Sequence, residues 1–168
     1  PFDVRTTCFS DEILELARRA IMDQMIGGEN IALLCSQQQA EEGFRHAFCT
    51  RLISDWGSVS NRTRESTTAF PLWINRPVRS SLTQYDLNLD HGPQPNINPD
   101  WLKASDSIED IFSYVYSLLN SPSYRSRYAT FLRTDFPRLP LTNSLELFKA
   151  LAKLGAELAA FHLMESPK

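Results

Sequence analysis

The sequence predicts an α+β fold: a mixed β-sheet with one or two helices in the N-terminal part, followed by a three-helix C-terminal unit. Two observations indicate this order. Short apolar runs separated by polar turns fill the first 74 residues, and regular helical periodicity begins only near Ser105. With 168 residues, 42% of them hydrophobic, the chain can bury a core of its own. We therefore expect one compact domain, with an α/β part at 1–104 and a helical unit at 105–168.

The first part of the chain alternates between extended and helical patterns. Residues 1–9 favour an extended conformation, and Ser10 can cap a helix that ends at Gly27-Gly28. The apolar runs at 30–36, 47–50 and 69–74 are the predicted strands, and a polar loop at 54–68 lies before the last of them. Residues 75–104 carry four of the ten prolines, which predicts a long irregular connection.

The helical unit is predicted from caps and periodicity. Ser107 and Asp110 have capping-box spacing, and Ser121 can cap a second helix with Pro122 at its first position. The prolines of the segment 136–140 end that helix. A last helix starts near Asn143, and it has an apolar stripe that needs a partner surface, either within this domain or on another part of the protein. The stripe consists of Leu147, Leu151, Leu154, Leu158 and Phe161.

Composition narrows the function without deciding it. The formal net charge is −3, so the chain as a whole is not a basic nucleic-acid binder, yet 13 of the 17 basic residues are Arg. Arg offers a planar fork that reads guanine or holds phosphate with two hydrogen bonds. A GC-rich genome is the alternative explanation for the excess of Arg.

Catalytic and membrane signatures are missing from the sequence. No glycine-rich nucleotide loop, G-x-S-x-G elbow or C-x-x-C pair occurs, and Asn98-Pro99-Asp100 reads as a turn. There is no apolar run of membrane-spanning length and no signal peptide, which predicts a cytoplasmic location. Because the chain starts at Pro1 without Met, we expect it to be a fragment of a longer protein.

Two polar segments are candidates for reading DNA bases. Asn pairs with adenine and Arg with guanine in the major groove, and the segment Asn61-Arg62-Thr63-Arg64 offers both in one loop. Gln37, Gln38 and Gln39 follow a predicted strand directly and form the second set, while Arg45, Arg76 and Arg79 are candidates for phosphate contacts. An ordinary solvated turn is the alternative for each loop. The helical spacing of Tyr114, Tyr116, Tyr124 and Tyr128 favours core packing over base stacking.

Several motifs in a fixed order carry a resemblance. They are Pro1-Phe2-Asp3-Val4-Arg5, a Gly28-Glu29-Asn30 run that continues to Gln38, Phe44-Arg45-His46, Ser60-Asn61-Arg62-Thr63-Arg64-Glu65, Pro95-Asn96-Ile97, Leu119-Asn120-Ser121-Pro122 with Tyr124-Arg125 and Tyr128, and Phe136-Pro137-Arg138-Leu139-Pro140. Together they resemble the C-terminal specificity domain of type ISP restriction–modification enzymes, which are single-chain DNA methyltransferase–nucleases. Gln37 stands where the family usually has Arg.

The resemblance implies a role in sequence-specific recognition of duplex DNA. The domain would position a target adenine for N6 methylation by a methyltransferase domain of the same polypeptide, and the parent enzyme would also have restriction endonuclease activity. No cofactor would belong to this chain, whereas S-adenosylmethionine, ATP and Mg would belong to the rest of the enzyme. Double-stranded DNA and the methyltransferase domain are the expected partners, with no membrane contact.

Two other classes of function stay open at this stage. A protein–protein or interdomain packing module without DNA contact predicts an exposed apolar stripe from Leu147 to Phe161 and no basic cleft. A small independent enzyme requires a pocket with converging ionisable groups. One face that carries Arg45, Arg62, Arg64 and Arg76 would favour DNA.

Overall fold

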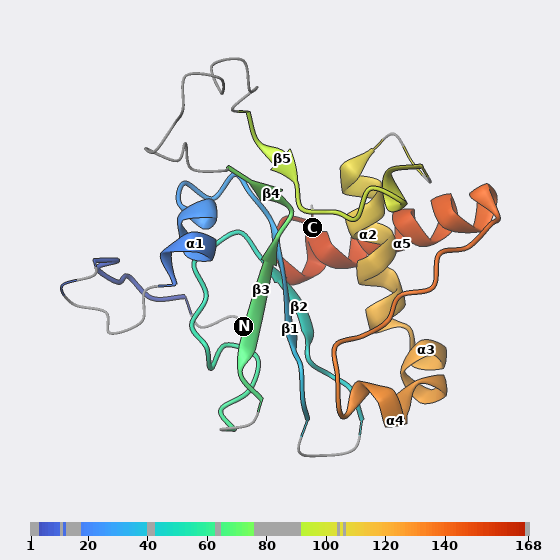
Figure 1. Cartoon of the computed structure of the whole chain (residues 1–168), viewed down its shortest axis with the longest axis horizontal. Coiled ribbons are helices and arrows are strands. Elements are labelled where there is room, and N and C mark those ends of the chain that lie inside the picture. Colours follow the sequence, from blue (N-terminus) through green and yellow to red (C-terminus); the bar gives the residue numbers. More distant parts are fainter. Residues whose placement is uncertain are drawn as a thin grey trace, which may run out of the picture.

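The chain folds into a small antiparallel sheet that packs against a helical unit (Figure 1). The structure is a computed structural model, and it describes residues 4–10, 12, 18–39, 43–62, 65–75, 92–103, 105 and 107–166. Strands precede the long helices along the chain, as the sequence predicts, and the α+β class is confirmed.

The main sheet has three strands in the order β2-β1-β3: β1 (Ala32–Ser36), β2 (Ala47–Thr50) and β3 (Thr67–Pro71). A second sheet pairs β4 (Trp73–Ile74) with β5 (Gln94–Pro95). Every described strand pair is antiparallel, so the prediction of a mixed sheet is wrong for these strands. Both β2 and β3 pair with the central strand β1 and run antiparallel to it. As a result, β2 and β3 point in the same direction on opposite sides of β1, and they do not pair with each other.

Each face of the sheet is covered by different elements. On one face, Leu34 and Ala69 contact Met22 of α1 (Arg19–Met22), beside the short 3-10 helix η1 (Asp23–Met25). On the other face, Cys35 packs against Leu119 of α2 (Ile108–Asn120). This alternation follows from the two-residue period of a strand. Where the sequence predicts a helix after Ser10, α1 begins only at Arg19, because Arg18 has a left-handed backbone conformation (φ 47°); residues 13–17 lie outside the described part.

The helical unit follows the predicted order with one break. After η2 (Trp101–Lys103), α2 is capped by the Ser107 hydroxyl, which accepts from the Asp110 N–H. The Ser121 hydroxyl caps α3 (Pro122–Arg127) in the same way. The predicted second helix is broken at Tyr128, after which α4 (Ala129–Leu132) begins. The last helix, α5 (Leu145–His162), starts one residue after its cap, Ser144.

The buried face of α5 is not the face that its leucine stripe predicts. The residues that face α2 are Phe148, Ala152, Gly155 and Ala159. A Cβ at Gly155 would lie 1.8 Å from the Ser113 carbonyl oxygen, so only Gly permits this approach of the two helices. The stripe predicted from the sequence turns outward in part, since Leu147 is 49% exposed, Leu154 59% and Phe161 64%.

The tyrosines of the helical unit are core residues, which confirms the packing prediction. Tyr114, Tyr116 and Tyr124 are buried. The Tyr114 hydroxyl donates to the Pro140 carbonyl at 2.8 Å, and the Tyr124 hydroxyl donates to the Arg138 carbonyl at 2.7 Å. These bonds fasten the proline-rich segment to the helices. Tyr116 meets His162 of α5 in the same core.

Candidate nucleic-acid interface

Most of the described candidate residues lie at one end of the sheet. Strand register pairs Ser36, the last residue of β1, with Thr67, the first residue of β3, and Cys35 with Ala47, the first residue of β2. The segments that follow β1 and precede β2 and β3 therefore meet at this end, which we call the turn end (Figure 1). It carries Gln37, Gln38, Arg45, Asn61 and Arg62, all with exposed side chains.

The segment after β1 is tied to the helical unit. Gln39 is buried, its N–H donates to the Arg133 carbonyl at 3.1 Å, and its side-chain Nε2 donates to the Leu132 carbonyl at 2.8 Å. The Ser36 hydroxyl donates to the Gln38 carbonyl at 2.9 Å. These bonds fix the backbone on both sides of Gln37 and leave the side chains of Gln37 and Gln38 in solvent.

Phe44 and Arg45 connect the beginning of β2 to the same helices. Phe44 is buried, and the Arg125 guanidinium lies 5.7 Å from the centre of its ring. Arg125 donates to the Leu119 carbonyl and to Asn120 Oδ1, so it is a structural residue. Burial lowers the pKa of Arg125, and the charge of Arg45 lowers it further. Arg45 is therefore near Arg125 but has its side chain exposed.

A buried carboxylate joins the two loops of the turn end. Glu65 is only 2% exposed, and its Oε2 contacts His46 Nε2 at 3.1 Å. The Ser60 hydroxyl donates to the same oxygen. Because His46 adjoins Arg45 and Ser60 adjoins Asn61, this contact holds both candidate segments in a fixed relation. In the sequence, only its place at the end of the Ser60-Asn61-Arg62-Thr63-Arg64-Glu65 motif indicates a role for Glu65.

The loop before β3 is further ordered by its backbone. The Glu65 N–H donates to the Arg62 carbonyl at 3.0 Å, and the Arg62 N–H donates to the Ser60 hydroxyl at 3.3 Å. The Thr67 N–H reaches the Trp56 carbonyl at 2.7 Å. Asn61 and Arg62 are thus carried on a closed turn. Four other candidates, Thr63, Arg64, Arg76 and Arg79, lie outside the described residues.

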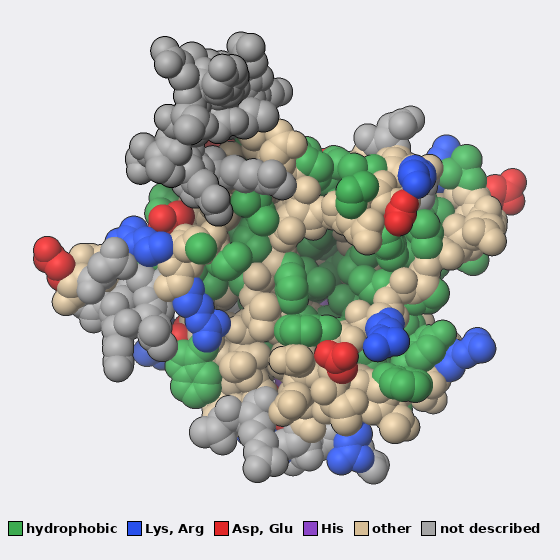
Figure 2. All heavy atoms as spheres, viewed as in Figure 1, with side chains coloured by type: hydrophobic (Ala, Val, Ile, Leu, Met, Phe, Trp, Pro, Cys, Tyr) green, Lys and Arg blue, Asp and Glu red, His purple; other side chains and the backbone are tan. Residues whose placement is uncertain are grey.

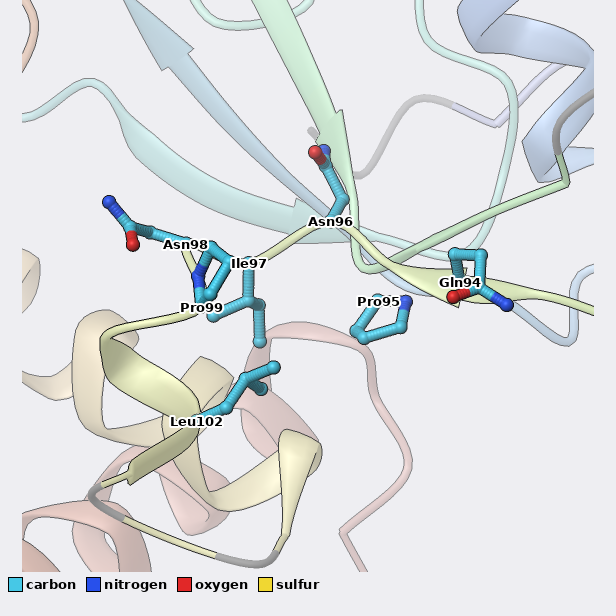
Figure 3. A pocket seen from close by; sticks show the side chains of 7 residues that line it. All are labelled: Gln94, Pro95, Asn96, Ile97, Asn98, Pro99 and Leu102. Atoms are coloured by element: carbon cyan, nitrogen blue, oxygen red, sulfur yellow. The ribbon is translucent and has the colours of Figure 1, made fainter.

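Nothing in the described part of the chain indicates a catalytic centre. A hollow of about 470 Å³ is lined by residues of the 94–102 segment that carry no ionisable side chain (Figure 3). A second hollow, of about 460 Å³, lies between the sheet, α2 and the segment 136–139, and its lining is mainly apolar (Figure 2). Burial raises the pKa of Cys35, which lines it, to about 12, so its thiol is not a ready nucleophile. Among the described residues, no group of three metal-ligating side chains occurs.

The described helices include none with the length and apolar character that a membrane span requires.

The fold and the turn end define an α+β binding domain, in which exposed amide and guanidinium groups are held on hydrogen-bonded loops. Residues 1–168 match the family described as Type ISP C-terminal specificity domain, and the chain belongs to this family. The resemblance inferred from the motifs is therefore confirmed.

Two solved structures are similar to this chain. The cryoEM structure of a DrdV–DNA complex has 29% sequence identity and a TM-score of 0.63 over 87% of this chain, which corresponds to 13% of that chain. A nuclease-deletion mutant of the Type ISP restriction–modification enzyme LlaGI, in complex with a DNA substrate mimic, has 25% identity and a TM-score of 0.54 over 80% of this chain and 10% of that chain. This chain therefore spans about an eighth or less of these proteins. A search of curated proteins gives no match.

Proposed function

We propose that this domain recognises a specific duplex DNA sequence for a restriction–modification enzyme. The observation that carries the proposal is the gathering of Gln37, Gln38, Arg45, Asn61 and Arg62 at the turn end of the sheet. Family membership and the two similar proteins, both solved with DNA or a DNA mimic, support it. The domain binds and orients DNA, and it makes no bond itself.

The exposed side chains have the chemistry that base readout needs. An amide of Asn or Gln donates to and accepts from adenine, and an Arg guanidinium donates to two acceptors of guanine. Arg45 is suited to a phosphate contact, which fixes register without reading sequence. Because Gln39 and Glu65 are buried anchors, these groups are placed before DNA arrives, and little ordering entropy opposes binding.

The finer part of the proposal concerns the reaction that the domain serves. We propose that recognition positions a target adenine for N6 methylation by a methyltransferase domain of the same polypeptide, and that the parent enzyme also cleaves DNA. S-adenosylmethionine, ATP and Mg would then belong to the rest of that polypeptide. In this proposal, the chain contributes specificity alone.

The test is the methylated motif produced by the full-length polypeptide in cells. Substituting Asn61→Ala and Arg62→Ala together should abolish or change one methylated adenine motif, mapped by single-molecule sequencing, because these side chains read bases in the proposal. A matched control, Asn143→Ala with Lys149→Ala, removes one exposed amide and one exposed cation from the α5 region and should leave the motif unchanged. An unchanged motif in the Asn61/Arg62 variant would remove this loop from the reading surface. A wild-type enzyme without sequence-specific methylation would refute recognition itself.

A second candidate function is interdomain packing, and one observation favours it. Leu147, Leu154 and Phe161 recur at seven-residue spacing on α5 and are exposed. An apolar line of this kind is typical of a contact surface. The two functions are compatible, because Arg51 at the end of β2 pairs with Glu165 just after α5 at 2.7 Å, which puts the end of this helix at the opposite end of the sheet from the turn end.

A further inference from the structure

The outer surface of α3 and α4 has an unusual composition. Tyr124 and Leu132 turn inward and are buried, so these two short helices have one face in the core. From Ser121 to Thr134 the sequence contains no carboxylate. The polar residues exposed on the outer face are all Ser, Thr or Arg: Ser123, Ser126, Arg127, Thr130, Arg133 and Thr134. Every one of these side chains can donate a hydrogen bond.

Tyr124 and Arg125, which belong to the family motif of this region, have structural roles and are not part of the outer face. The Tyr124 hydroxyl donates to the Arg138 carbonyl, and Arg125 donates to the carbonyl that ends α2 at Leu119. Arg127, by contrast, is exposed, and its guanidinium lies 6.0 Å from the centre of the Tyr128 ring. Arg127 can therefore contact a partner without disturbing the packing below it.

This face adjoins the turn end of the sheet. The carbonyls of Leu132 and Arg133 accept the two hydrogen bonds from Gln39, directly after the exposed Gln37 and Gln38. Phe44 lies beneath Arg125, next to the exposed Arg45. Figure 1 shows α4 at the same end of the molecule as the turns between the strands. Figure 2 shows Lys and Arg side chains around the corner that holds α3 and α4.

The segment 122–138 has a formal charge opposite in sign to that of the whole chain. Residues 122–138 contain four Arg and one Asp, a formal charge of +3, whereas the complete chain has a formal net charge of −3. Arg125 is engaged in the core contacts described above, so the exposed charges of the segment are Arg127, Arg133 and Arg138 together with Asp135. A local excess of this kind attracts a polyanion even when the whole molecule is acidic.

We infer that the outer face of α3 and α4, centred on Arg127, grips the phosphate backbone of the duplex beside the bases read at the turn end. The inference rests on the proposed function, and it adds a surface that the motifs do not contain. Arg supplies charge-assisted hydrogen bonds to phosphate oxygens, and Ser and Thr hydroxyls donate to the same oxygens. Contacts of this type carry affinity and register but no sequence information.

The experiment measures the salt dependence of DNA binding by the full-length polypeptide. Fluorescence anisotropy on a short labelled duplex of mixed sequence is recorded between about 50 and 200 mM salt, where each phosphate contact contributes about 0.9 to the slope of log K against log salt. For Arg127→Ala with Arg133→Ala we expect the slope to fall by about 2 and binding to weaken about tenfold or more, equally on all duplexes. The methylated motif should stay the same, since no base contact is lost.

Two further variants make the result specific. Arg127→Lys with Arg133→Lys should restore most of the slope, because a phosphate accepts Lys as a point charge. Lys149→Ala with Lys153→Ala removes two exposed cations from α5 and should leave the slope at the wild-type value. Circular dichroism of each variant checks that the fold is retained.

The outcomes separate this inference from the proposed function. If the double alanine variant keeps the wild-type slope and affinity, the phosphate contact is refuted, and a motif change in the Asn61/Arg62 variant would still support base reading. If the variant changes the methylated motif while keeping the slope, the surface reads bases instead, and the inference is again refuted. If the wild-type polypeptide binds no DNA, both the inference and the proposed function fail.

Discussion

At the scale of single residues, the most consequential group is the Glu65 carboxylate. It is buried between the two loops of the turn end, where His46 and Ser60 both contact its Oε2. Removing one member of such a network leaves the others buried without a partner, which costs more than the hydrogen bond itself contributes. Glu65 thus links the stability of the domain to the placement of Arg45 and Asn61.

Substitution of Glu65 is expected to lower stability and to loosen specificity together. Glu65→Ala should reduce the free energy of unfolding by about 2–4 kcal/mol, because it removes the buried acceptor of the partly buried His46 and Ser60. Urea denaturation of the 168-residue chain measures this loss. Glu65→Gln, which keeps the shape and one acceptor, should cost less.

The control for this prediction is Glu157→Ala, which removes an exposed carboxylate from α5 and should change stability by less than about 0.5 kcal/mol. In the full-length polypeptide, Glu65→Gln should also lower the preference for the methylated motif over near matches. A Glu65→Ala variant as stable as the control would contradict the anchoring role.

At the scale of elements, the contact between α2 and α5 depends on small residues. Ala152, Gly155 and Ala159 line the buried face of α5, and Gly155 lies against the backbone of Ser113. Larger side chains on this face would separate the helices and disturb the stacked rings of Tyr114 and Phe148, whose centres are 4.7 Å apart. The close approach explains why the apolar stripe of leucines is not the buried face.

The contact between Gly155 and Ser113 decides whether Gly155→Ala raises or lowers the free energy of unfolding. In an exposed helix, replacing Gly with Ala stabilises by roughly 0.5–1 kcal/mol. Here the added Cβ would lie 1.8 Å from the Ser113 carbonyl oxygen, so we expect destabilisation by about 3 kcal/mol instead. Urea denaturation gives the sign directly. Ala156→Gly, at the exposed neighbouring position, serves as the control and should cost about 1 kcal/mol through helix propensity alone.

At the scale of the whole molecule, two surfaces of different character lie at opposite ends of the sheet. The turn end has polar and cationic side chains, and α3 and α4 extend it with Arg, Ser and Thr. The other end holds the pair Arg51 and Glu165, next to which α5 finishes. This separation allows DNA at one end and a protein contact along α5 at the same time.

The outward stripe of α5 is predicted to dock on the rest of the full-length polypeptide. Leu154→Glu with Phe161→Glu places two charges on that stripe, and burying them would be costly, so the domain should detach. Hydrogen exchange on the full-length polypeptide measures this as lost protection of the partner surface, while α2 keeps its protection. Ala156→Glu, an exposed position off the stripe, should have no such effect. Unchanged protection in the double variant would show that the stripe has no partner.

The extent to which the sequence predicted the site differs among its residues. The polarity of Gln37, Gln38, Asn61 and Arg62 is visible in the sequence, and so are the strands they adjoin. Their gathering at one end is not, because it depends on β1 pairing with both β2 and β3. Gln39 reads as one of three equal amides, yet it alone is buried, since only the fold brings the carbonyls of Leu132 and Arg133 to it.

The sequence by itself determined the α+β class, the caps at Ser107 and Ser121, the core role of the tyrosines and the family. These features depend on local periodicity, capping chemistry and motif order, which neighbouring residues specify. Only the tertiary structure decided the antiparallel pairing, the buried face of α5 and the meeting of the loops with α3 and α4. The physical reason is that these depend on contacts between segments distant in the chain, where backbone approach at Gly155 or one hydrogen bond from Gln39 overrides local preference.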